Sequence, residues 1–137
     1  MNEVDLHLHT TSSDGSLTPT KIVDLCVERG LNIIAITDHD STEGIEEALS
    51  AAAKYEKIHV IVGIELSTDV VDGEIHLLGY YVDYRNPTLQ SKLRQFRDGR
   101  TERGNRMVEK LNGLGIKISW DRVKEIAAGG AIGRPHI

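Results

Sequence analysis

The sequence is poor in cysteine, proline and aromatic residues, and it has no long hydrophobic run. Its 137 residues include one cysteine, three prolines, one phenylalanine and one tryptophan. A lone cysteine excludes an intrachain disulfide framework, and we expect Cys26 on the buried side of a helix. No apolar stretch approaches the roughly 20 residues that cross a bilayer, and the acidic N-terminus is unlike a secretory signal. We therefore expect one globular domain that works in the cytoplasm and has no membrane partner.

The charge of the chain changes sign part-way along it. Residues 1–84 contain 16 acidic side chains against 4 basic ones, whereas residues 85–134 contain 5 against 12. An acidic half suits divalent cations and a basic half suits phosphate groups, so this asymmetry points to partners of both kinds. The alternative is a solvated helix face that happens to be rich in arginine.

Predicted strands and helices alternate over the first half of the chain. Strands are expected at 2–8, 32–37, 59–67 and 74–83, with a tight turn at 71–74. Thr18-Pro19 predicts the start of a first helix that Gly30 ends, and Ser41 or Thr42 is expected to start a second. This alternation predicts a parallel α/β sheet or barrel, in which ligands bind beyond the carboxyl ends of the strands.

The second half of the chain has a helical pattern instead. Apolar residues recur at helical spacing from Asn86-Pro87 to Leu114, although Gly99 and Gly104 make us expect a kink or break there. A shorter helix is expected at 119–127, with Trp120 as a core residue.

Two histidines of the first strand are spaced for a shared target. His7 and His9 lie two residues apart, and side chains at that spacing project from the same face of a strand. His39, Glu65 and His76 follow later in the chain, and all of these are metal-ligand types. The alternative is a pair of half-exposed strand histidines without a function.

Six short motifs in register decide between these interpretations. They are Asp5-Leu-His-Leu-His9, Ser12-Ser13-Asp14-Gly15, Thr37-Asp38-His39-Asp40, Gly63-Ile-Glu65-Leu-Ser67, His76-Leu-Leu-Gly79-Tyr80 and Gly133-Arg134-Pro135-His136. In order and wording they resemble the PHP (polymerase and histidinol phosphatase) superfamily of metal-dependent phosphoesterases, above all its stand-alone, TrpH-like members. The resemblance runs from residue 3 to the last residue.

The resemblance implies an α/β fold, namely a distorted seven-stranded β/α barrel with metal ions at the carboxyl ends of its strands. It divides the chain into a barrel portion with the metal site (1–85), a helical insertion (86–130) and a return to the barrel (131–137). Family members close the site with a late Asp-x-His motif, which this sequence does not reach. We therefore expect an incomplete barrel with weak catalysis by this chain alone, and a fragment that self-associates, pairs with a missing segment or is marginally stable.

The resemblance also implies a set of metal ligands. One ion would be held by His7, His9 and Glu65, a second by Glu65, His76 and His136, and a third by Asp14 and His39. Imidazole and carboxylate ligands suit two or three ions of Mn, Zn or Fe, with Mg as a further candidate. Asp5, Asp38 and Asp40 are expected to orient the imidazoles, the alternative being that they cap loop ends.

The implied chemistry is hydrolysis of phosphate esters by metal-activated water. Asp14, His39 and Glu65 would serve this reaction by holding metal, so no protein nucleophile is required. Arginine favours bidentate contacts with phosphate. The candidate arginines for substrate phosphate are Arg134 in the Gly-Arg-Pro-His motif and Arg100, Arg103 and Arg106 on the helical segment, with ordinary surface ion pairs as the alternative.

Three functions are consistent with these residues. The leading hypothesis is an enzyme that hydrolyses phosphorylated small molecules or nucleotides, including 3′,5′-bisphosphate nucleotides and the ends of short oligoribonucleotides. The second is the nuclease module of a DNA polymerase, which shares the metal motifs. The third is a metal-binding fragment without catalytic activity.

Overall fold

The computed structural model of the chain describes residues 3–70 and 73–137, and it confirms the α/β class. Its elements are β1 (Glu3–Leu8), α1 (Pro19–Glu28), β2 (Leu31–Ile36), α2 (Ile45–Ala52), β3 (His59–Val70), β4 (Gly73–Tyr80), α3 (Pro87–Gly113), α4 (Trp120–Ala127) and a 3-10 turn (Arg134–His136). The turn expected at 71–74 lies partly outside the described residues. Within the described part, none of the helices is both long and apolar enough to span a membrane.

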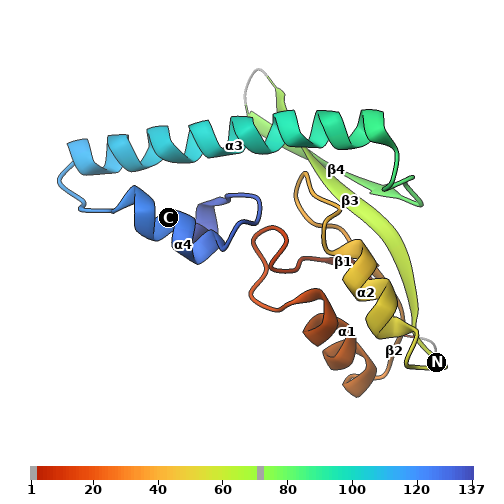
Figure 1. Ribbon diagram of the computed structural model, residues 1–137. Helices are drawn as coiled ribbons and strands as arrows, with labels where there is room; N and C mark the ends of the chain where they lie inside the picture. Colours follow the sequence, from red (N-terminus) through yellow and green to blue (C-terminus); the bar gives the residue numbers. More distant parts are fainter. Residues whose placement is uncertain (1–2, 71–72) are drawn as a thin grey trace.

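The four strands form one curled sheet in the order β1-β2-β3-β4. The first three strands are parallel, as predicted, and β4 is antiparallel to β3. β3 pairs with β2 only up to Val62, and from Gly63 onward it pairs with β4. A Cβ at Gly63 would lie 2.7 Å from the Thr37 side chain and 2.9 Å from a backbone oxygen, so glycine allows the close approach at this change of partner. Figure 1 shows β3 as a long curved strand beneath α3.

The first helix begins as predicted, and the second begins later than predicted. Thr18 caps α1 by accepting a hydrogen bond from the backbone N–H of Lys21, and Pro19 follows at the first helical position. The prediction that Ser41 or Thr42 starts α2 was wrong, because the helix begins at Ile45. The Ser41 hydroxyl instead accepts from the N–H of Glu43 within the loop.

The long helix α3 is continuous over its 27 residues, so the expected break at its two internal glycines was wrong. Asn86 caps its start by accepting from two backbone N–H groups. Gly104 lies within 3.3 Å of the Trp120 ring, as measured from the position of an added Cβ, and this packing explains why the helix has a glycine there. Gly99 has no neighbour of this kind.

Two hydrophobic clusters stabilise the molecule. The first lies between the sheet and helices α1 and α2, and it contains Cys26, which is 4% exposed as the sequence predicted. The second joins α3, α4 and the C-terminal segment around Val108, Val123 and Ile132, with Trp120 packed against it. The first cluster packs helices α1 and α2 against β1, β2 and β3. This packing holds the strands in place, so the loops that follow them start from fixed positions.

The outer strands of the sheet carry exposed apolar side chains. On β1 these are Val4 and Leu6, and on β4 they include Ile75 and Leu77, which are 50% and 54% exposed. Apolar side chains on sheet edges favour association. The predicted self-association of the chain remains a prediction.

Candidate metal centre

The predicted ligands come together at one end of the sheet. His7 and His9 come from the end of β1, and His39 from the loop after β2. The backbone connects this loop to β3, because the N–H of Glu65 donates to the oxygen of Asp38 at 3.2 Å and Glu65 forms an isolated bridge with His39. Glu65 therefore lies where β3 leaves β2, at the carboxyl end of the parallel part of the sheet.

Glu65 is the centre of this cluster. Its side chain is 5% exposed, and Oε2 lies 2.8 Å from Nε2 of His7 and 2.9 Å from Nε2 of His9. Its other oxygen, Oε1, lies 2.7 Å from Nδ1 of His76 on β4. One buried carboxylate thus contacts imidazoles from both outer strands of the sheet.

Asp14 forms a second carboxylate centre on the loop after β1. Its Oδ1 lies 3.2 Å from Nδ1 of His9, and its Oδ2 lies 3.6 Å from Nε2 of His39. His9 therefore lies between the two carboxylates, because its other ring nitrogen contacts Glu65.

Three overlapping groups of these residues have the spacing needed for metal ions. The ligand atoms of each group lie within 4.8 Å of one another, and the groups are His7 with His9 and Glu65, His9 with Asp14 and His39, and His39 with Glu65 and His76. Mixed imidazole and carboxylate sets of this kind suit divalent transition metals. The first group was predicted as a set. The place of His39 in the third group, beside Glu65 and His76, was not predicted.

An unpartnered buried atom supports a metal at this place. Among the described residues, Nδ1 of His39 is buried without a hydrogen-bond partner, and it lies 3.6 Å from Oε2 of Glu65. Buried polar atoms nearly always have a hydrogen-bond partner, so a buried nitrogen without one indicates that a ligand binds there. The residues present therefore fit a metal ion.

The pKa directions in the cluster favour the forms that bind metal. Burial, together with the charge of Arg100, lowers the pKa of His39 to about 4, so this imidazole is neutral at pH 7. The hydrogen bond with His9 lowers the pKa of Asp14 to about 2. Burial acts to raise the pKa of Glu65, but its contacts with His7 and other imidazoles outweigh burial and lower it. Both carboxylates are thus ionised.

Asp38 is a buried carboxylate that supports the cluster through hydrogen bonds to the loop after β1. It is 1% exposed, and its carboxylate accepts hydrogen bonds from the N–H and hydroxyl of Thr10, both at 2.7 Å, and from the hydroxyl of Ser13 at 2.5 Å. The Ser13 hydroxyl also lies 3.4 Å from Nδ1 of His9. Asp38 therefore acts on this imidazole through Ser13, whereas Asp5 accepts a bond from the backbone N–H of His7.

Removal of the Ser13 hydroxyl tests this support. We expect Ser13→Ala to lower the free energy of unfolding by about 1.5–3 kcal/mol, because the lost bond is made to a buried charged group. Chemical denaturation measures this change. Ser16→Ala at an exposed position of the same loop is the control, and equal stability of the two variants would contradict the role of Asp38.

His136 lies outside the three groups of candidate ligands. It is buried, but its Nδ1 accepts a hydrogen bond from the N–H of Gly133 at 3.0 Å, and it belongs to none of the three groups. The predicted role of His136 as a ligand beside Glu65 and His76 remains a prediction, and the described groups place His39 beside these two residues.

The predicted arginines have different surroundings. Arg100 is 7% exposed, and its Nε donates to Oδ2 of Asp40 at 2.5 Å while its Nη2 donates to the Ser67 hydroxyl. This buried pair holds Arg100 beside Asp40, and its assignment to substrate phosphate remains a prediction. Sequence reasoning missed Arg97, which donates to the backbone oxygen of Asp40 at 3.1 Å.

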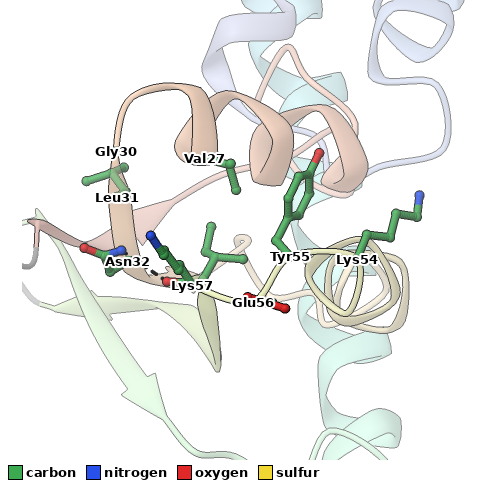
Figure 2. A pocket seen from close by; sticks show the side chains of 9 residues that line it. Val27, Gly30, Leu31, Asn32, Lys54, Tyr55, Glu56 and Lys57 are labelled. Carbon is green, nitrogen blue, oxygen red and sulfur yellow. Dashed lines mark hydrogen bonds between the residues drawn. The ribbon is translucent and has the colours of Figure 1, made fainter.

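The other three arginines line cavities. Arg103 and Arg106 border a cavity of about 270 Å³ beside Arg100, and Arg134 borders an apolar one of about 380 Å³ near Met107. A third cavity, of about 360 Å³, lies at the opposite ends of β2 and β3. Figure 2 shows Tyr55 and Lys57 at its edge. It contains none of the predicted site residues, so we do not connect it with the metal centre.

A profile of the PHP domain matches residues 5–117. The chain belongs to the PHP domain family. This PHP chain is 38% identical to the 5′-3′ exoribonuclease Rnm of Salmonella typhimurium over 133 residues, which are 96% of this chain and 45% of that protein. It is also 38% identical to the 3′,5′-nucleoside bisphosphate phosphatase of Chromobacterium violaceum over 121 residues, which are 88% of this chain and 42% of that protein.

A solved structure supports the same conclusion for the fold. An amidohydrolase from Chromobacterium violaceum, with bound sulfate and no metal, superposes with a TM-score of 0.90 at 36% identity, covering 98% of this chain and 47% of that one. The chain thus spans about half the length of the relatives that it matches. The prediction of part of a PHP-type barrel is confirmed.

Proposed function

We propose that this PHP chain is part of a metal-dependent phosphoesterase that hydrolyses phosphate esters of nucleotides or of short RNA. The single observation that carries the proposal is Glu65, whose buried carboxylate contacts His7, His9 and His76 beside the unpartnered nitrogen of His39. Such a cluster is costly to bury unless it binds a cation. The two relatives named above act, by their names, on RNA and on nucleoside bisphosphates.

The chain's own residues would divide the work as follows. Glu65 would bridge two ion sites, because each of its oxygens contacts a different set of imidazoles. Asp14 and His39 would hold a third site on the loop side. Metal ions bound there would supply Lewis-acid stabilisation of phosphoryl oxygens and a water of lowered pKa. Manganese, zinc and iron are the candidates that this donor set favours.

The cluster contains no group suited to act as a covalent nucleophile. The hydroxyl of Ser13 donates to Asp38, and the hydroxyl of Thr10 does the same, so both serve the support of the site. Glu65 and Asp14 are surrounded by imidazoles. We therefore propose attack by water.

The experiment is a hydrolysis assay with controlled metal content. The protein is stripped with EDTA, reloaded with Mn²⁺, and incubated with adenosine 3′,5′-bisphosphate and with a 5′-phosphorylated oligoribonucleotide. We expect release of phosphate or mononucleotide that EDTA abolishes and Mn²⁺ restores. Turnover that ignores EDTA would contradict the proposal, as would no turnover of either compound by the longer protein of which this chain is part.

A further inference from the structure

We propose that the cavity of about 270 Å³ on α3 is a nucleobase subsite, where the base of the substrate stacks on Phe96 between Arg103 and Arg106. This inference rests on the proposed function and names the part of the substrate that the site recognises. It assigns a role to the only phenylalanine of the chain and to a glycine in the middle of α3.

The cavity shares a wall with the metal centre. Asp40 and Ser67 form one side of it, and the face of α3 from Gln95 to Arg106 forms the other. Asp40 directly follows His39 in the sequence, and Ser67 lies opposite His76 in the β3–β4 ladder. A nucleotide with its phosphate at the metal centre can therefore extend its base toward α3, which passes above β3 and β4 in Figure 1.

Phe96 is the aromatic residue that lines this cavity. It is 43% exposed and lies one turn from Leu93, which is fully buried. Flat aromatic rings that are open to solvent are the usual platforms on which bases stack. Phe96 also differs from the exposed apolar residues of β1 and β4 because charged and polar side chains surround it in the cavity.

Gly99 keeps the space beside Phe96 open. A glycine inside a helix lowers helix stability. At Gly104 the close packing of the Trp120 ring explains why glycine is present. A Cβ at Gly99 would meet nothing within 4 Å, so the folded chain does not require glycine there. The residue lies three positions after Phe96 and four before Arg103, on the same face of the helix. Its small size leaves room for a ligand.

The remaining side chains match a nucleotide. Arg103 and Arg106 line the cavity and bring positive charge for phosphate and for stacking on a base. Gln95 and Glu102 border the same cavity and offer acceptors for the amino groups of a base edge. An aromatic ring, guanidinium groups and edge acceptors are the parts of a base-binding site.

The test compares a ligand that has a base with one that lacks it. Calorimetry measures binding of adenosine 5′-monophosphate and ribose 5-phosphate to the Mn²⁺-loaded protein. We expect the nucleotide to bind more tightly, and Phe96→Ala to weaken its binding by about 5- to 100-fold while ribose 5-phosphate binds as before. The matched control is Ile126→Ala, which removes another exposed apolar side chain, on α4, and should change neither affinity.

Substitutions at Gly99 provide the second arm. Gly99→Leu should fill the cavity and abolish the preference for the nucleotide, whereas Gly99→Ala should keep this preference and raise the melting temperature. Equal binding of the two ligands to the unaltered protein would overturn the subsite, as would an equal loss of both in Phe96→Ala. If phosphate esters are not hydrolysed but Phe96 still governs nucleotide affinity, the proposed function fails and the subsite stands.

Discussion

Glu65→Gln is expected to remove the metal and, with it, all activity that depends on metal. The amide keeps the shape of the side chain but loses the charge that three imidazoles share within 2.9 Å. Substitutions of residues that only orient metal ligands lower metal affinity by about 10- to 100-fold, so loss of a bridging carboxylate should exceed about 100-fold. Metal content after dialysis against Mn²⁺, measured by elemental analysis, checks this result.

The control for this prediction is Glu56→Gln. Glu56 is exposed at the other end of the strands, so its amide should leave metal content and turnover unchanged. A Glu65→Gln protein that retains its full metal content would show that the ions are held elsewhere. Circular dichroism of both variants establishes that they are folded.

Arg100→Ala is expected to destabilise the protein more than any other single arginine substitution on α3. Its guanidinium is 7% exposed and its partner Asp40 is 1% exposed, so removal leaves a buried carboxylate without its cation. Breaking a buried ion pair in this way costs about 3–5 kcal/mol. Because Asp40 follows His39 directly, metal affinity should fall as well.

Two further variants test the cause of that loss. Arg100→Ala combined with Asp40→Asn should recover part of the lost stability, because the amide carries no charge that needs a partner. Arg85→Ala breaks the exposed pair with Glu46 and should cost about 0–1 kcal/mol. If Arg100→Ala and Arg85→Ala lower the free energy of unfolding equally, the buried pair has no special role.

Strand periodicity and parallel topology account for four members of the cluster, whereas Asp14 and His76 were implied only by the resemblance of the motifs to the PHP superfamily. His7 and His9 follow from the spacing of two, and His39 and Glu65 follow from strands that end beside β1. The position of His136 does not follow from strand spacing, and its role as a ligand remains a prediction. Its ring accepts a bond from a backbone group three residues earlier, and spacing does not reveal such a local turn.

Other features depend on contacts between distant segments. Phe96 and Leu93 share the helical spacing, but the sequence does not say which face of α3 lies on the sheet, and only Leu93 is buried. Ser41 and Thr42 are good helix caps, yet the loop that holds Asp40 beside Glu65 uses these residues and delays the helix. Gly99 and Gly104 look alike in the sequence, and the positions of Ile132 and Trp120 beside Gly104 distinguish them.

The most direct test of the account is a crystal structure of the protein grown with Mn²⁺, with anomalous diffraction recorded at the manganese edge. The account predicts anomalous density among His7, His9 and Glu65, and further density beside His39. A structure with the same fold but no anomalous density at these side chains, or with manganese bound only elsewhere, would contradict the metal centre.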